Sequence, residues 1–206
     1  MRLAEGFAHQ LAHPAGWAGR FLGRAMDVAN RRPMHMAVGM LSIRPGEAVL
    51  DAGCGTGAAL AEMRWRGPAS LTGVDRSPVM LDMAQRKTRG AATLLQGDLA
   101  ALPLPDGRVD AALALNTLYF DDYAHRFVRE LHRVLRPGGR MVAYVTHSDT
   151  MRGWAFTRAG LHRLYDAEGL RAALIAGGFA PDAIAVHEVA VTRSVRGLIG
   201  HARRGA

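Results

Sequence analysis

Cysteine and lysine are almost missing from this chain of 206 residues, which has one of each, Cys54 and Lys87. A single cysteine excludes an intramolecular disulfide and a cysteine-based zinc site, and we expect no bound metal. The N-terminal stretch lacks the uninterrupted apolar core of a signal peptide, and no run approaches the roughly 20 apolar residues of a membrane span. We therefore expect a cytoplasmic protein.

Acidic residues are the minority among the charged ones. The chain has 26 Lys and Arg against 18 Asp and Glu, a formal net charge of +8. Such a charge favours an acidic partner, which could be nucleic acid, an anionic membrane or an anionic substrate. Dense basic runs are missing, and the nearest candidates are Arg31, Arg32, Arg193, Arg196, Arg203 and Arg204. This pattern favours a diffuse basic surface, and we do not expect a nucleic-acid partner.

Short apolar runs alternate with helical patterns from residue 46 onwards. The expected strands are "EAVLDAG", "SLTGVD", "AATLLQGD", "RVDAALALN" and "RMVAYVTH", and the expected helices between them are "TGAALAEMRWR", "SPVMLDMAQRKT" and "HRFVRELHRVL". The strands are continuous apolar runs, which is typical of strands covered on both faces in a parallel sheet. The pattern therefore predicts a doubly wound α/β fold.

The C-terminal end breaks this alternation. A helix in "AEGLRAALIAGGF" precedes two strands, "AIAVHEVAV" and "SVRGLIGHAR", which have only a short polar link between them. Two strands without a helix between them form an antiparallel hairpin. We expect a mainly parallel, Rossmann-like sheet of seven strands over residues 43–206, finished by this hairpin and preceded by a helical segment over residues 1–42.

The stretch "LDAGCGTG", residues 50–57, follows the first expected strand. Ligands of such sheets bind outside the carboxyl ends of the strands. Three glycines at alternate positions permit a tight turn and a close approach of the backbone to a ligand, and the next helix offers free N–H groups. The loop is therefore a predicted ligand site.

Several ligands compete for this loop. A phosphate-binding P-loop is excluded because no lysine follows Gly57. A dinucleotide remains open, since Gly53, Gly55 and Ala58 match its fingerprint and Asp75 lies where a ribose-binding acid belongs. Two other acids favour a different cofactor. Asp51 suits an ammonium and is unfavourable beside a pyrophosphate, and Asp98 can accept a hydrogen bond from an adenine amine.

Four segments in order resemble the class I S-adenosylmethionine-dependent methyltransferases. They are "PGEAVLDAGCGTG", "LTGVDRSPVMLDMA", "LLQGDLAALPLPDGRVDAALALNTLYF" and "LHRVLRPGGRMVAY", which lie within residues 45–145, and the tail "GGFAPDAIAVHEV" fits as well. The chain is most similar to the small-molecule branch that contains the ubiquinone- and menaquinone-biosynthesis-type enzymes. The resemblance implies transfer of a methyl group from S-adenosyl-L-methionine, with S-adenosyl-L-homocysteine as the product.

The resemblance also implies roles for individual residues. Asp51 would orient the methionine amine, Asp75 would bind both ribose hydroxyls, and Asp98 would read the adenine edge. The full set of implied cofactor residues is Asp51, Gly53, Cys54, Gly55, Gly57, Asp75, Arg76, Met80, Gly97, Asp98, Leu99 and Asn116.

Displacement at a sulfonium mainly requires alignment, and a base is needed only when the acceptor must lose a proton. The resemblance therefore implies no universal catalytic residue. Tyr119 and His147 follow the fourth and fifth expected strands and are the candidate acid/base or orienting groups. The candidate acceptor-binding residues are His35, Tyr119, His147, Arg152 and Trp154.

The N-terminal segment mixes Trp17, Phe21 and Leu22 with arginines, as an interfacial amphipathic helix does. The resemblance implies that residues 1–42 form a helical lid over a small or lipid-like acceptor. The composition is compatible with peripheral membrane contact, although Pro14, Gly16, Gly19 and Gly23 weaken the helix. Nucleic-acid methylation is not expected, because the fourth strand ends in "ALNTLYF" and lacks an Asn/Asp-Pro-Pro-aromatic motif. An NAD-dependent oxidoreductase and a non-catalytic cofactor-binding module are the alternatives, and the sequence specifies neither the acceptor nor the oligomeric state.

Overall fold

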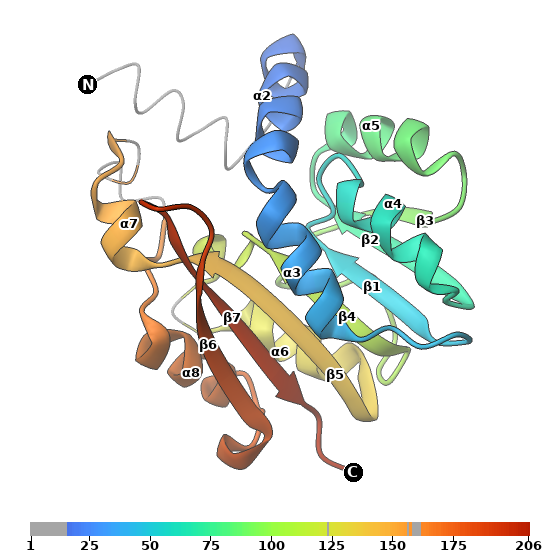
Figure 1. The fold of residues 1–206 in the computed structure, drawn as a ribbon. Coiled ribbons are helices and arrows are strands. Elements are labelled where there is room, and N and C mark those ends of the chain that lie inside the picture. The colour runs from blue at the N-terminus through green and yellow to red at the C-terminus, as the bar shows by residue number, and fades with distance from the viewer. Residues whose placement is uncertain (1–15, 123, 156, 158–161) are drawn as a thin grey trace.

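The computed structural model describes residues 16–122, 124–155, 157 and 162–206. Its core is a seven-stranded sheet in the order β3-β2-β1-β4-β5-β7-β6 (Figure 1). The strands are β1 Ala48–Ala52, β2 Ser70–Asp75, β3 Thr93–Gln96, β4 Val109–Leu115, β5 Leu135–Thr146, β6 Ile184–Ala190 and β7 Arg196–Arg203. The first five are parallel, and β7 runs antiparallel to both β5 and β6. This architecture confirms the predicted fold class.

Helices cover both faces of the sheet (Figure 1). The α-helices are α2 Gly16–Ala29, α3 Arg31–Leu41, α4 Ala58–Met63, α5 Pro78–Thr88, α6 Arg126–Val134, α7 Ser148–Arg152 and α8 Ala167–Ala176. Short 3₁₀ turns are η1 Arg64–Arg66, η2 Leu118–Phe120 and η4 Pro181–Ala183. The buried residues of α3 and α4 form one apolar cluster with the sheet, and those of α6 and α8 form a second. The sheet is therefore covered on both faces, as its continuous apolar strands require.

Local sequence signals set several of these boundaries. Helix α5 begins at Pro78 after the N-cap Ser77, whose hydroxyl accepts a hydrogen bond from the Met80 N–H at 3.4 Å. Strand β5 begins earlier than the sequence predicts, at Leu135, because α6 ends directly in an extended residue. The register against β4 shifts between Val109, which pairs with Leu135, and Ala111, which pairs with Arg140, so the residues "RPGG" form an irregular part of the strand.

The two N-terminal helices have different surroundings. In α3, Ala37, Val38 and Leu41 are fully buried against the sheet. The Arg140 guanidinium fixes the end of α3 by donating to the Leu41 carbonyl at 2.7 Å and by pairing with Glu47 at 2.7 Å. Helix α2 instead crosses the carboxyl end of the sheet (Figure 1). The division of the chain at residue 42 stays a prediction, and residues 1–15 of the expected lid lie outside the described residues.

None of the helices in the described part of the chain is long and apolar enough to cross a bilayer.

Candidate functional site

The glycine loop joins the end of β1 to the start of α4. Gly53 and Cys54 donate their N–H groups to the Val74 carbonyl at 2.8 and 3.0 Å, so the loop is attached to β2. Gly53 (φ +80°) and Gly57 (φ +76°) have left-handed backbones, and a Cβ on Gly57 would lie 2.9 Å from the Ala84 Cα. Gly55 also has a positive φ, of +49°, but a Cβ there would meet no described atom within 4 Å. Gly53 and Gly57 therefore serve the fold, whereas Gly55 borders open space.

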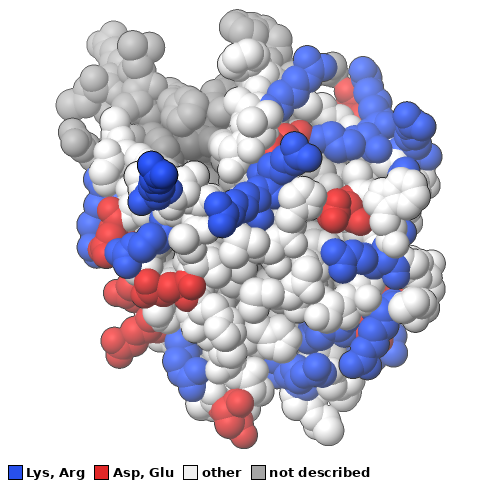
Figure 2. Space-filling model, in the orientation of Figure 1, with Lys and Arg blue, Asp and Glu red and all other residues white. Residues whose placement is uncertain are grey.

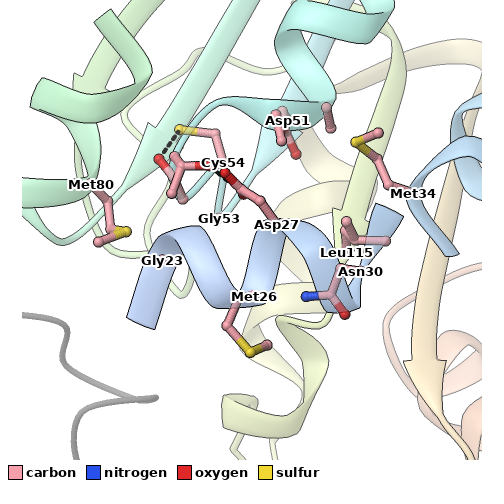
Figure 3. Close-up of a pocket in the computed structure, with 14 residues that line it drawn as sticks. Gly23, Met26, Asp27, Asn30, Met34, Asp51, Gly53, Cys54, Met80 and Leu115 are labelled. Atoms are coloured by element: carbon pink, nitrogen blue, oxygen red, sulfur yellow. Dashed lines mark hydrogen bonds between the residues drawn. The ribbon is translucent and has the colours of Figure 1, made fainter. Parts of the chain in front are cut away.

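A cavity of about 150 Å³ lies between this loop and α2 (Figure 3). Its lining residues are Gly23, Met26, Asp27, Asn30, Met34, Asp51, Gly53, Cys54, Gly55, Thr56, Ala58, Ala59, Met80 and Leu115. Five of the predicted cofactor residues are thus brought together: Asp51, Gly53, Cys54, Gly55 and Met80. Burial raises the pKa of the Cys54 thiol, so this group stays protonated and contributes packing rather than reactivity.

Asp51 is the fully buried carboxyl group of this cavity, which Asp27 also lines. The Asp51 side chain is buried with 1% relative exposure, and its Oδ2 has no hydrogen-bond partner among the described residues. Burial, and next the negative charge of Asp75, raise its pKa to about 7. A buried carboxylate is costly unless a cation pairs with it. The cavity therefore fits a ligand with an ammonium group at this point.

Asp75 lies beneath the loop at the end of β2. Its Oδ2 accepts the Gly55 N–H at 2.9 Å and its Oδ1 accepts the Ser77 N–H at 2.8 Å. Burial raises the pKa of this carboxyl, and the two N–H donors and Arg76 oppose the rise. A carboxylate oxygen can accept two hydrogen bonds, so each oxygen keeps capacity for a ligand hydroxyl. Asp75 thus fixes the loop and retains the chemistry for a ribose.

The residues predicted for the adenine lie outside this small cavity. Asp98 is exposed and its Oδ1 accepts the Ala100 N–H at 2.9 Å, while Arg76 is also exposed. Leu99 is partly buried and lies against Gly53, and Gly97 packs against Pro103. The roles of these residues stay predictions. The small cavity lies where the resemblance predicts the methionine end of the cofactor.

Helix α2 supplies lining residues that the sequence analysis does not identify. Gly23, Met26 and Asp27 of α2 and the following Asn30 line the small cavity, and Asp27 points towards the glycine loop (Figure 3). Their spacing of three, four and seven residues places them on one helix face, which is the signal that could have found them. The Asp27 carboxylate pairs with Lys87 of α5 and accepts the Thr56 hydroxyl at 2.5 Å. This contact holds α2 against the glycine loop.

A second and larger cavity of about 720 Å³ adjoins the first, because Met26 and Asn30 line both. Its lining residues are Met26, Ala29, Asn30, Pro33, Asn116, Tyr119, Phe120, Tyr144, Thr146, Met151, Gly153, Trp154, Ala155, His162, Val191, Thr192 and Val195. No Asp, Glu, Lys or Arg is among these described lining residues. The second cavity is therefore suited to an apolar, uncharged molecule.

Tyr119 belongs to a hydrogen-bonded chain at the junction of the cavities. Its hydroxyl donates to Asn116 Oδ1 at 2.9 Å and accepts the Thr146 N–H. Asn116 Nδ2 in turn donates to Asn30 Oδ1 at 2.9 Å. Burial raises the pKa of Tyr119 above its ordinary value, so a phenolate is not available near neutral pH. The chain of contacts makes Tyr119 a positioning group of the cavity wall.

Replacement of Tyr119 by Phe tests this role. The change leaves the Thr146 N–H and Asn116 Oδ1 without this partner, and we expect the free energy of unfolding to fall by about 1–3 kcal/mol. Urea unfolding of the variant measures the loss. The pH dependence of turnover should keep its shape. A variant of unchanged stability whose pH profile loses a limb would instead make Tyr119 an acid/base group.

The other candidate acceptor residues are placed differently. His147 is buried and caps α7, since its Nδ1 accepts the Asp149 N–H at 3.1 Å. Arg152 is exposed and pairs with Asp149 at 2.9 Å, and His35 lies 3.5 Å from Glu62. The structure brings none of these three to either cavity, whereas Trp154 lines the larger one.

His162 is a lining residue that the sequence analysis misses, because no strand end or motif marks it. Its ring centroid lies 6.1 Å from that of Tyr119 and 5.1 Å from that of Phe120. Burial lowers the pKa of this imidazole, so it is mainly neutral near pH 7 and able to accept a proton. The larger cavity thus contains one imidazole among aromatic and apolar walls.

Comparison with known proteins agrees with this geometry. A methyltransferase domain family matches residues 50–143. A malonyl-[acyl-carrier protein] O-methyltransferase of Serratia marcescens is 41% identical over 102 residues, which are 50% of this chain and 39% of that protein. A demethylmenaquinone methyltransferase of Thermus thermophilus is 38% identical over 128 residues, 60% of this chain and 56% of that one. The chain therefore spans about half the length of these relatives or less.

A solved structure supports the fold over nearly the whole chain. The complex between the Haloferax volcanii Trm112 methyltransferase activator and a methyltransferase contains a chain that superposes with a TM-score of 0.81. The identity is 20%, and the match covers 92% of this chain and 96% of that one. The strand order and the glycine loop define a class I methyltransferase fold. The matches over residues 50–143 and to the two named enzymes make the chain similar to the class I S-adenosylmethionine-dependent methyltransferases, the family that the four segments resemble.

Proposed function

We propose that this protein transfers a methyl group from S-adenosylmethionine to an uncharged, largely apolar small molecule. The observation that carries the proposal is the larger cavity, whose described lining has no charged side chain and which meets the cavity of the glycine loop at Met26 and Asn30. Donor and acceptor sites must adjoin for an in-line displacement. Methyl transfer is favoured over NAD-dependent oxidation by the family match and by Asp51.

The residues at the glycine loop fit the cofactor. Asp51 offers a buried, unpaired oxygen to the ammonium, Gly55 borders open space, and Asp75 retains acceptor capacity for the ribose hydroxyls. When bound, S-adenosylmethionine supplies an activated methyl group on a positively charged sulfur. The chain itself then holds the acceptor in line and excludes water through apolar walls such as Met26 and Met151.

A hydroxyl acceptor would also have to lose a proton. Among the described residues of the larger cavity, His162 is the group able to take it near neutral pH, because its neutral imidazole has a lowered pKa. Tyr119 is excluded from this role by its raised pKa and its hydrogen bonds. We therefore assign proton acceptance to His162 and positioning to Tyr119.

The names of the two relatives differ in what they imply. The demethylmenaquinone methyltransferase of Thermus thermophilus is named for a lipid-like quinone, and the Serratia marcescens enzyme for a malonyl group carried by a protein. A malonyl carboxylate in the larger cavity would lack a cationic partner among its described lining residues. The lining therefore supports an acceptor of the lipid-like kind.

Calorimetry with S-adenosylhomocysteine and turnover with labelled S-adenosylmethionine test the proposal. We expect micromolar cofactor binding, no thermal shift with NADH, and methylation of neutral apolar phenols and quinols in preference to carboxylates or amines. Absence of S-adenosylhomocysteine binding would contradict S-adenosylmethionine as the methyl donor. Cofactor binding without turnover on a broad panel would instead indicate a non-catalytic module.

Replacement of Gly153 by Leu tests the larger cavity separately. Gly153 lines it with an ordinary φ of −73°, so the leucine side chain occupies acceptor volume without backbone strain. We expect the KM for an apolar acceptor to rise about tenfold and the Kd for S-adenosylhomocysteine to stay unchanged. Ala91→Leu, at an exposed position that lines neither cavity, is the control. An unchanged KM in Gly153→Leu would place the acceptor elsewhere.

A further inference from the structure

We propose that the outer face of α2 docks on an anionic lipid bilayer, from which the apolar acceptor reaches the larger cavity. This face consists of Phe21, Arg24, Ala25 and Val28, which recur at helical spacing and are all exposed. The delivery of the acceptor rests on the proposed function, whereas the docking does not.

The exposure of two large apolar side chains marks this face. Phe21 is 73% exposed and Val28 is 79% exposed, and their spacing of seven residues places both on one side of α2. Only two other large apolar residues of the described chain, Trp65 and Ile175, are exposed, and they lie on different elements. A single exposed apolar residue needs no explanation, but two on one helix face indicate contact with an apolar phase. The side chains of Trp17, Arg20 and Leu22 lie outside the described part.

The charge of α2 fits an anionic surface. Arg24 and Arg31 are exposed, and neither pairs with a carboxylate of the described residues. Asp27, the one acid of α2, turns inward to Lys87 and Thr56 and leaves the outer face without negative charge. Figure 2 shows Lys and Arg side chains over α2 and the start of α3. Arginines around an apolar helix face interact with anionic headgroups while the apolar residues enter the acyl boundary.

The position of α2 connects this face to the cavity. Met26 of α2 and Asn30, which directly follows α2, line both cavities, and the exposed Ala29 lies in the lining of the larger one. An apolar acceptor dissolved in a bilayer would therefore meet the cavity beside the docked helix, without passing through water. An anionic bilayer would therefore bury the apolar side chains, pair with the arginines and supply an uncharged molecule to the cavity.

Vesicle co-sedimentation tests the proposal with the intact chain. The probes are vesicles of equal parts phosphatidylglycerol and phosphatidylcholine, and vesicles of phosphatidylcholine alone. We expect binding to the anionic vesicles that weakens with salt, and at least tenfold weaker binding to the neutral ones. Two double variants should each lower the partition coefficient about tenfold. The first combines Phe21→Gln with Val28→Gln, and the second combines Arg24→Gln with Arg31→Gln. Trp65→Gln is the matched control, because Trp65 is 75% exposed beside Arg64 and lines neither cavity.

Three results would overturn docking through α2. The first is a wild-type vesicle partition coefficient in both double variants, and the second is a loss of vesicle binding in Trp65→Gln. The third is a loss of thermal stability in Phe21→Gln with Val28→Gln, which would show that this face packs within the protein. Equal binding to neutral vesicles would also contradict it. Calorimetry with S-adenosylhomocysteine on the same variants separates the two proposals. Normal vesicle binding without cofactor binding would defeat the proposed function alone.

Discussion

Replacement of Asp51 by Asn should weaken binding of S-adenosylhomocysteine about 100-fold and stabilise the protein without cofactor. The ligand ammonium would lose a charge-assisted partner in a site closed to water, which is a loss of about 3 kcal/mol. Without cofactor the same carboxylate is buried with an unpaired Oδ2, so its removal relieves a desolvation cost. Calorimetry measures the first effect and thermal unfolding the second.

The raised pKa of Asp51 makes both effects depend on pH. In the free protein this pKa is about 7, above the ordinary 3.8, so the folded state binds an extra proton between these values. The free energy of unfolding of the cofactor-free protein should therefore fall as the pH rises from about 4 to 7, and the penalty is complete above 7. Binding of the ammonium requires the ionised form. Cofactor affinity should thus rise with pH up to about 7 and then level off.

Proton release on binding distinguishes a charge interaction of Asp51 with the cofactor from a purely steric effect of this side chain. At pH 6 the wild-type protein should release nearly one proton when it binds the cofactor product, because Asp51 ionises on binding. Calorimetry in two buffers of different ionisation enthalpy counts this proton. Asp51→Asn should release none, and Asp182→Asn, which removes an exposed acid, should behave as the wild type. Equal proton release by Asp51→Asn and the wild type would assign the titration to another group.

The sequence predicts the sheet and the glycine loop because both depend on short-range patterns. Continuous apolar runs specify strands covered on both faces, and the absence of a helix before the last strand specifies the hairpin that the structure contains. Asp51, Gly55 and Met80 reach the small cavity because the ends of β1 and β2 and the start of α5 hold them there. Their positions along the chain fix their positions in space.

The acceptor side depends on contacts that no local pattern encodes. His147 follows β5 as a candidate should, but its ring turns to cap α7, while His162 reaches the cavity from a stretch without a motif. The contact between Asp27 and Lys87 joins residues 60 positions apart. Such pairings arise only when α2 packs on α5. The sequence therefore predicts the lining of the small cavity better than that of the larger one.

Replacement of Gly53 by Ala should destabilise the fold by about 2–4 kcal/mol, the largest stability effect expected in the loop. Its φ of +80° disfavours any side chain, and a Cβ would lie 2.2 Å from the Thr117 Cγ2. Gly55→Ala is the matched variant. Its φ of +49° carries strain of about 1 kcal/mol, but the added methyl meets no described atom within 4 Å. Urea unfolding of both variants measures this difference in stability.

Cofactor affinity should fall more in Gly55→Ala than in Gly53→Ala, which is the reverse of the order expected for stability. The methyl group of Gly55→Ala projects into the space where the cofactor is expected to approach the loop backbone. We therefore expect at least a tenfold loss of S-adenosylhomocysteine affinity in a protein that remains folded. Gly53→Ala should lose S-adenosylhomocysteine affinity only in proportion to the fraction of molecules whose loop is unfolded. A lower temperature should restore part of this affinity. Wild-type affinity in Gly55→Ala would mean that the ligand does not approach this backbone. We therefore expect Gly53 to serve the fold and Gly55 to leave room for the predicted methyl donor.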